Sequence, residues 1–434
     1  MSSRRHFLKQ SGAALAAAGL SIPQVLASAP RRMAPSDTLR IGLIGCRNMG
    51  FGNLEGHLRQ PGVVCGGLCD VDSEVLDRRA ADVERLTGQR PPVYGDFRKM
   101  LEDKDLDAVI IGTPDHWHCL MMVQACEAGK HVYVEKPMAN SIAECARMTQ
   151  AARYYQRVVQ VGQQQRSGEH WQRVVDYVRS GKLGQIRRVQ VWANFDYGKG
   201  QPRVPDQTPP ATLDYDMWLG PAPAQPYNPS RTHGSWRHQW DFGGGLLTDW
   251  GVHLLDIVLW AMDVKGAPRA VSASGGIFAY PDRAIETPDT LDVAYDMGGW
   301  NLTWEHTGGT QRGIYGRNYG IAFFGNLGTL VVNRAGWEIL PQSEGGRYLT
   351  EAIPPQAGVE SNHERHAIDF IAAIREGRDP RCTVEMGEAA AFYAHLGNIA
   401  LRTGSRLVWN PDTRTFGKNK AANALLTPTY RKPW

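Results

Sequence analysis

Apolar residues follow one pattern in the first part of the chain and another in the second. Between residues 39 and 162, short apolar runs alternate with stretches of helical periodicity, and short loops separate them. This alternation predicts a doubly wound parallel β-sheet. The predicted strands are 39–45, 63–70, 92–94, 106–112, 131–137 and 158–162, and the predicted helices are 73–86, 119–129 and 141–155.

From Ile186 onward, apolar and polar residues alternate along shorter runs, which predicts β-strands. The predicted elements of this part are strands at 188–194, 290–296, 299–307 and 328–333 and helices at 362–376 and 384–402. A Pro-rich stretch from Gln201 to Pro229 has no periodicity, and insertions of this length are usually functional loops or oligomer arms. The 434 residues suffice for two domains, because single cores seldom grow past about 250 to 300 residues.

A turn with two glycines follows the first predicted strand. The sequence Gly45-Cys-Arg-Asn-Met-Gly50 has Arg47 where a dinucleotide-binding turn has its middle glycine. That glycine lets the backbone approach the pyrophosphate, which binds at the helix N-terminus. Arg47 therefore either extends over the phosphates as a charged clamp or marks a degraded site. Alone, the motif is weak evidence.

An acidic residue ends the second predicted strand. Asp70 follows the glycine turn by about 20 residues, the spacing at which a carboxylate accepts hydrogen bonds from the adenosine ribose. A carboxylate in this place repels a 2′-phosphate, which favours NAD over NADP. The alternative role, capping of the next helix, suits Asp72.

Polar residues also follow the later strands of the first part. Thr113-Pro-Asp-His-Trp-His118 comes after one buried strand, and Glu135-Lys136-Pro137 comes after the next. Ligands of open α/β sheets bind beyond the carboxyl ends of the strands, so both segments face the predicted cofactor site. Lys136 is either a group that acts on the substrate or a solvated loop lysine. His116 and His118 lack a third ligand nearby, and we assign no metal.

A second informative stretch lies between residues 236 and 256, where a run of three glycines precedes an apolar helix. Asp249 and His253 are four residues apart, which places them on one helical face. A neighbouring carboxylate raises the pKa of a histidine and orients its ring, as a general base requires. The alternative is a capping Asp and a core His.

The N-terminus has the features of an export signal. Arg4 and Arg5 form a twin-arginine pattern, an uncharged apolar segment follows, and Ala27-Ser-Ala29 is a cleavage site. Twin-arginine export carries folded proteins, so we predict a periplasmic protein that is cleaved after Ala29 and has already bound a cofactor.

Composition excludes several other classes of protein. Loss of residues 1–29 lowers the formal charge from +4 to +1, and no basic face or motif indicates nucleic-acid binding. No apolar run approaches the roughly 18 residues of a membrane span. The seven cysteines have neither metal-ligand spacing nor an even count, so we predict no disulfide framework.

Several of these motifs occur together in one known family. They are the glycines of 45–50, the segments 113–118 and 135–137, and Asp249-x-x-x-His253. With them the sequence resembles the Gfo/Idh/MocA oxidoreductases over residues 39–409. The resemblance implies an α/β fold with an N-terminal Rossmann domain and a C-terminal domain with a large, open, mostly antiparallel sheet that often supports homo-oligomers. It implies oxidation of a secondary hydroxyl of a sugar, glycoside or cyclitol with a nicotinamide cofactor. It places Lys136 between nicotinamide and substrate, Pro137 after a cis peptide, and His253 as the acid/base.

These inferences assign a domain or a role to each part of the chain. The predicted domains are a signal peptide (1–29), a Rossmann domain (38–162), a substrate-binding and oligomerisation domain (163–410) and a tail (411–434). The predicted cofactor-binding residues are Gly45, Arg47, Asn48, Met49, Gly50, Asp70, Thr113, Pro114, Asp115, His118, Glu135 and Lys136. The predicted catalytic residues are Lys136, Asp249 and His253.

Three further residues are expected to contact the substrate: Gln163, Arg166 and Trp240. For Arg166 an interdomain ion pair is an equally good interpretation. The leading hypothesis is a periplasmic dehydrogenase that oxidises a ring hydroxyl and keeps its NAD bound. The alternative hypothesis is a glycoside hydrolase or lyase that oxidises its substrate transiently, with no net redox change.

Overall fold

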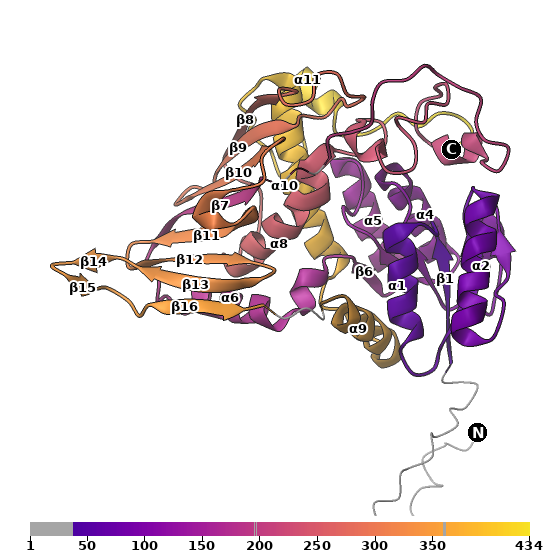
Figure 1. Cartoon of the computed structure of the whole chain (residues 1–434), viewed down its shortest axis with the longest axis horizontal. Helices are drawn as coiled ribbons and strands as arrows, with labels where there is room; N and C mark the ends of the chain where they lie inside the picture. The colour runs from indigo at the N-terminus through magenta and orange to yellow at the C-terminus, as the bar shows by residue number, and fades with distance from the viewer. Residues whose placement is uncertain (1–37, 195, 197, 359–361) are drawn as a thin grey trace, which may run out of the picture. The chain divides into compact units, whose positions relative to one another are not determined.

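The computed structural model describes residues 38–194, 196, 198–358 and 362–434, so the predicted signal peptide and its cleavage site lie outside the described residues. The first sheet has six parallel strands in the order β3-β2-β1-β4-β5-β6 (Figure 1). Its strands are β1 (Leu39–Ile44), β2 (Val63–Cys69), β3 (Val93–Tyr94), β4 (Ala108–Ile111), β5 (His131–Val134) and β6 (Val159–Val161). All four residues of β4 are buried, as expected for a strand covered on both faces. The predicted doubly wound parallel sheet is confirmed.

Five helices connect these strands: α1 (Asn48–Leu58), α2 (Ser73–Thr87), α3 (Phe97–Leu101), α4 (Asp115–Glu127) and α5 (Ile142–Tyr154). The predicted start of α4 is wrong, because this helix begins at Asp115 and not at Cys119. Burial explains the error: Asp115, His116, Trp117 and His118 are all buried, so this turn shows no amphipathic stripe. The side chains that follow β4 are therefore held on a helix.

The second sheet has eight strands in the order β16-β13-β12-β11-β7-β10-β9-β8. Only β7 and β10 pair in parallel, which confirms a mostly antiparallel sheet. The strands are β7 (Ile186–Ala193), β8 (Ala270–Gly276), β9 (Thr290–Asp296), β10 (Asn301–Thr307), β11 (Tyr319–Gly325), β12 (Gly328–Asn333), β13 (Gly336–Pro341) and β16 (Ile353–Ala357). A small hairpin, β14 (Ser343–Glu344) and β15 (Arg347–Tyr348), extends beyond β13 (Figure 1).

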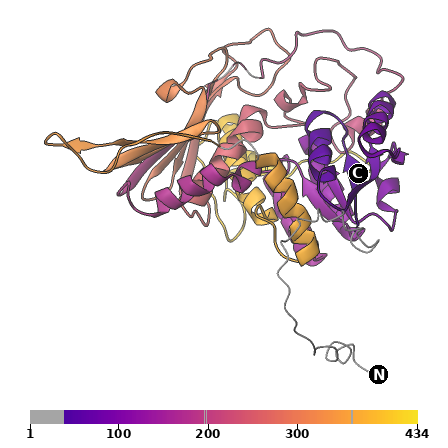
Figure 2. The same cartoon turned by 60° about the horizontal axis from the view of Figure 1, so that its bottom comes forward.

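Two helices near the end of the chain, α9 and α10, pack on different sheets. The later helices are α6 (Glu169–Arg179), α7 (Tyr215–Leu219), α8 (Val252–Ala261), α9 (Asn362–Glu376), α10 (Val384–Thr403) and α11 (Lys420–Ala424). Phe370 and Ile371 of α9 join the core formed by β1 and α1, whereas Tyr393 of α10 joins the core of the second sheet. Figures 1 and 2 show α9 beside the first sheet although it follows the second in sequence. The core of the parallel sheet thus includes residues from far beyond position 162.

The Pro-rich insertion folds back onto the parallel sheet. The amide of Asp214 donates to the carbonyl of Val71 at 2.9 Å, and the amide of Ser73 donates to that of Thr212 at 2.9 Å. Its apolar residues form a cluster of their own with Trp236 and Phe242. The insertion therefore covers the connection between β2 and α2.

The tail after residue 411 also contacts the first part of the same chain. Tyr430 donates to Glu144 at 2.6 Å, and the ring of Trp434 packs edge-on against Trp117. All seven cysteines are free thiols. Within the described ranges, no helix is long and apolar enough to cross a membrane.

Candidate active site

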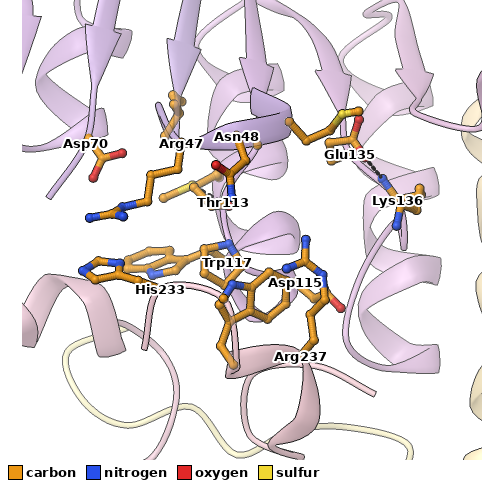
Figure 3. A pocket seen from close by; sticks show the side chains of 18 of the residues that line it. Arg47, Asn48, Asp70, Thr113, Asp115, Trp117, Glu135, Lys136, His233 and Arg237 are labelled. Atoms are coloured by element: carbon orange, nitrogen blue, oxygen red, sulfur yellow. Dashed lines mark hydrogen bonds between the residues drawn. The ribbon is translucent and has the colours of Figure 1, made fainter. Parts of the chain in front are cut away.

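A cavity of about 360 Å³ lies at the carboxyl ends of β1, β2, β4 and β5. The other side is lined by Met217 and Trp218 of the insertion, by residues between 233 and 253, and by Arg334 of the β12–β13 turn. His233 and Arg237 of this side are labelled in Figure 3. Ten of the twelve predicted cofactor-binding residues line it, together with all three predicted catalytic residues. The predicted cofactor site and the predicted reactive groups therefore share one cavity.

The glycine turn allows α1 to approach the strand ends closely. Gly45 has a φ of +87°, and a Cβ on Gly50 would lie 2.1 Å from the Gly45 carbonyl oxygen. A Cβ on Gly112, at the end of β4, would lie 2.5 Å from the Cα of Gly50. Gly50 therefore acts through packing and does not line the cavity. The first turn of α1 has no acidic residue and no side-chain cap, so its free N–H groups suit a pyrophosphate.

Arg47 lies over the cavity and is held there by an ion pair. Its Nη2 atom is 2.8 Å from Oδ2 of Asp72, which also caps α2 by accepting from the amide of Glu74. Of the two interpretations of Arg47, this position supports the clamp. His233, which follows the insertion in sequence, lies across from it, with Nε2 3.7 Å from the same Asp72 oxygen.

Asp70 is at the same end of the cavity as Arg47 and His233 (Figure 3). Its carboxylate accepts from the amides of Cys46 at 2.7 Å and Asp72 at 3.1 Å. Burial is the largest influence on Asp70 and raises its pKa, while these amides oppose the shift. The two bonds fix the carboxylate where β2 ends, the place required for ribose recognition.

Lys136 lies at the opposite end of the cavity (Figure 3). Its Nζ atom donates to Oδ1 of Asp249 at 2.5 Å and to the Asp249 carbonyl at 2.8 Å. The Lys136–Pro137 peptide is cis, as the resemblance implies. Arg237 Nε is 3.3 Å from the same carboxylate oxygen. An ammonium has three N–H donors, so two of them hold Lys136 in place and one remains for a ligand.

Glu135 braces the backbone at this point. It is buried and accepts from Asn53 at 2.8 Å, from Gln164 at 3.1 Å and from the amide of Lys136 at 3.1 Å. Asp115 is buried nearby, and burial raises its pKa well above the usual range while Arg237 opposes the shift.

His253 differs from its prediction in one respect. Asp249 was expected to raise the pKa of His253, but that pKa is lowered, first by burial and then by Lys136 and Arg334, and the opposing effect of Asp249 is smaller. The Nδ1 atom of His253 is buried and has no hydrogen-bond partner among the described residues. Residues 247–251 form a π-helical turn before α8, so the α-helical spacing argument does not apply unchanged. The imidazole is neutral at neutral pH.

Two predicted ligands, His118 and Arg166, lie outside the cavity and form structural contacts within their own domains. His118 contacts the carbonyls of Pro137 at 2.8 Å and Thr113 at 2.9 Å, so it links two strand-end loops. Arg166 forms a buried bidentate pair with Asp256 at 2.7 to 2.9 Å. Arg166 therefore forms an ion pair and does not line the cavity, but its partner lies in the same predicted domain, so the pair is not interdomain.

The other two predicted substrate ligands do not line the cavity either. Gln163 is buried, and neither amide atom has a hydrogen-bond partner among the described residues. Trp240 stacks with Arg402, whose Cζ lies 4.8 Å from the ring centroid. The cavity is lined instead by Gln164, the residue after Gln163, and by Trp236, four residues before Trp240.

Several residues of the cavity wall were missed. They are Trp218, Trp236, His233, Arg237, Trp250, Arg334 and His363, from segments spread over more than a hundred residues. Arg237 and Trp250 lie in the informative stretch around Asp249 and were within reach of prediction. His233 and Arg334 have no local motif, because only the tertiary fold brings them to the cavity.

Two family comparisons cover most of the chain. Residues 39–163 match the oxidoreductase family with an NAD-binding Rossmann fold, and residues 170–297 match the C-terminal α/β domain of the same family. The chain therefore belongs to the Gfo/Idh/MocA oxidoreductase family, and its first domain is an NAD-binding Rossmann domain. The resemblance stated from the sequence is confirmed.

Two curated relatives have the same name and match a similar share of the chain. A glycosyl hydrolase family 109 protein of Shewanella sp. (strain W3-18-1) is 34% identical over 203 residues, which are 42% of this chain and 44% of that protein. A glycosyl hydrolase family 109 protein of Shewanella baltica (strain OS155 / ATCC BAA-1091) is 32% identical over 201 residues, again 42% and 44%. The matched part spans less than half of these curated relatives.

Two solved structures share the fold. Levoglucosan dehydrogenase, in complex with NADH and levoglucosan, superimposes with a TM-score of 0.64 at 21% identity and covers 86% of this chain and 99% of that one. The aldose-aldose oxidoreductase from Caulobacter crescentus, complexed with glycerol, has a TM-score of 0.64 at 19% identity, with the same coverage.

Proposed function

We propose that the protein oxidises a secondary ring hydroxyl of a sugar, glycoside or cyclitol with NAD. One observation carries the proposal: Lys136, Asp249 and His253 line the same cavity as Gly45 and Asp70. Four tryptophans also line the cavity, and two of them, Trp236 and Trp250, are sequence neighbours of Arg237 and Asp249. Flat aromatic rings pack well against the apolar face of a pyranose.

In the proposed reaction His253 is the general base. Its lowered pKa keeps the imidazole neutral, which is the form that accepts a proton from the substrate hydroxyl. The third N–H of Lys136 donates to that oxygen, and Asp249 holds the ammonium in place. Bound NAD supplies the acceptor for the C–H hydrogen, which leaves with both electrons as the C=O bond forms.

A second candidate function is glycoside hydrolysis through transient oxidation, and the names of the Shewanella relatives favour it. A ring ketone acidifies the neighbouring C–H, so a base removes that proton and the C–O bond to the aglycone breaks. Water then adds to the unsaturated sugar, and the hydride returns to the ketone. The net reaction is hydrolysis with no change in the cofactor.

One experiment separates the two functions. The purified protein is incubated in D₂O with a panel of p-nitrophenyl glycosides, and released nitrophenol, reduced nicotinamide and deuterium in the product are measured. Net oxidation predicts reduced nicotinamide and keto-sugar in equal amounts. Hydrolysis predicts nitrophenol, deuterium next to the oxidised carbon, and no accumulated reduced nicotinamide. If none of the glycosides reacts in either way, both candidates are wrong.

We further propose that the protein is exported to the periplasm with its NAD bound. The insertion supports this, because its bonds to Val71 and Ser73 cover the cavity beside Asp70. Mass spectrometry of denatured protein from a periplasmic extract should find one nicotinamide per chain. Protein without nicotinamide, or mature protein found only in the cytoplasm, would contradict this proposal.

We also propose that the chain forms a homo-oligomer through its second sheet. The exposed Tyr348 on the β14–β15 hairpin supports this proposal, since its side chain is 70% exposed. Light scattering should give a multiple of the chain mass, and a monomer at micromolar concentration would contradict it.

A further inference from the structure

Arg334 reaches the cavity from the second sheet. It is the first residue of the two-residue turn between β12 and β13. Asn333 and Gly336, which flank this turn, are paired across the two strands. Arg317 fixes this turn, because its Nη1 atom donates to Asn333 Oδ1 at 3.2 Å and to the Gly336 carbonyl at 2.8 Å. Arg334 is therefore held in position by its hairpin.

The side chain of Arg334 is oriented by two further contacts. Its Nε atom donates to Gln165 Oε1 at 3.0 Å, and its Cζ lies 4.6 Å from the centroid of the Trp250 ring. These contacts use one edge and one face of the guanidinium. No carboxylate in the described part of the chain forms an ion pair with Arg334.

The other charged groups at this end of the cavity have partners. Lys136 and Arg237 both contact Asp249, and Arg237 also opposes the raised pKa of Asp115. Glu135 is bound by amide groups. Arg334 is different, since burial lowers its pKa and only the more distant Tyr319 and Asp249 oppose the shift. Arg334 is partly buried, and a partly buried cation without a paired anion costs free energy that a bound anion would offset.

We propose that Arg334 binds the carboxylate of the substrate, and that the substrate is an acidic sugar, a uronic acid or its glycoside. This inference rests on the function proposed above and names its substrate class. The remaining N–H groups of a guanidinium match a carboxylate in a bidentate pair. The ring centroid of His253 is 6.1 Å from that of Trp250, so Arg334 and His253 flank the same indole. A pyranose bound beside Trp250 would therefore be near both groups.

The test compares methyl β-D-glucuronide with methyl β-D-glucoside, which differ only in the carboxylate at C6. The rates are measured at about pH 8, where His253 is neutral with or without Arg334. Wild-type protein should have a kcat/KM for the glucuronide about 10- to 100-fold above that for the glucoside, the range for one charged hydrogen-bond pair. Arg334→Gln should lower the ratio of the two kcat/KM values, glucuronide over glucoside, to about 1.

Arg402→Gln is the matched control. Arg402 also stacks on a tryptophan, Trp240, and burial likewise lowers its pKa, but it does not line the cavity. This variant should keep the wild-type preference. An equal preference in wild type and Arg334→Gln overturns the inference. Faster oxidation of methyl glucoside 6-phosphate than of the glucuronide overturns the carboxylate assignment.

A binding measurement judges the inference separately from the reaction. Glucuronide should quench tryptophan fluorescence saturably in wild type, because Trp250 lies beneath Arg334, and Arg334→Gln should lose this effect. If no sugar is oxidised but this pattern is found, the proposed function fails and the inference stands. If the glucoside is oxidised and the glucuronide neither reacts nor quenches, the inference fails and the function stands.

Discussion

The two ends of the cavity differ in how far apart their residues lie in the sequence. One end lies beside the glycine turn, and the other holds Lys136. Gly45, Arg47 and Asp70 lie within a short stretch, on a turn and a strand end whose spacing is set by local structure. Lys136, Asp249, His253 and Arg334 come from three distant segments. A nucleotide site of this kind is therefore visible as a motif, whereas the reactive end depends on how the two sheets pack.

The comparison predicts that the two ends can be inactivated separately. His253→Ala should lower kcat by about 10²- to 10⁴-fold, the usual range for loss of a general base, and Lys136→Ala should have a similar effect. His253→Ala should not alter the affinity for NAD measured by calorimetry by more than about threefold. Loss of NAD binding together with turnover would show that the ends are not independent, and undiminished turnover in both variants would refute the catalytic assignment.

The next largest effect is expected at the glycine turn. Gly50→Ala places a Cβ where the Gly45 carbonyl oxygen is 2.1 Å away, so α1 must move, at a cost of about 1 to 3 kcal/mol. NAD affinity should fall with it. Gly52→Ala on the same helix is the control, because its Cβ meets no atom within 4 Å. Urea denaturation should show Gly52→Ala as stable as wild type or slightly more stable, and equal loss in both variants would contradict the packing role.

A smaller effect is expected from the acidic residue that ends β2. Asp70→Asn removes the negative charge that disfavours a 2′-phosphate, so the ratio of NAD to NADP affinity should fall by about tenfold. The protein should stay folded, since an amide oxygen can still accept one of the two backbone bonds. An unchanged ratio would place the discrimination elsewhere, for example at Arg47.

The smallest effect is a displacement of the pH profile. His253 acts as a base only when neutral, so kcat/KM falls as the pH drops through its pKa. Because burial, Lys136 and Arg334 lower that pKa, the acidic limb should lie below the ordinary histidine value near 6.5. Arg334→Gln removes a cation and should move the limb to higher pH. A limb that moves to lower pH would contradict the assigned cause.

Most of the fold followed from the periodicity of the sequence, and the errors have identifiable causes. Strands 290–296 and 328–333 and the helix 362–376 have the predicted bounds. The first strand alternates buried and exposed residues, and the second is buried throughout. The start of α4 was missed because its first turn is buried all round. That α9 packs on the first sheet could not be seen from a local pattern.

The candidate site was predictable where a role depends on neighbours in the sequence. Lys136 and Asp70 were placed correctly in the cavity because they end buried strands. The pKa direction of His253 was wrong, since it depends on burial and on the distant Arg334. Arg166 and Trp240 have partners, Asp256 and Arg402, that no motif indicates.

The central claim is that this cavity removes a hydride from a sugar ring carbon. Stopped-flow absorbance of reduced nicotinamide, recorded as NAD-loaded protein is mixed with glucuronides and neutral glycosides, tests it most directly. We expect a reduced-nicotinamide signal that lasts for a dehydrogenase, is transient for a hydrolase, and is absent in His253→Ala. Release of aglycone or keto-sugar by the wild type, with no reduced nicotinamide at any time, would contradict it.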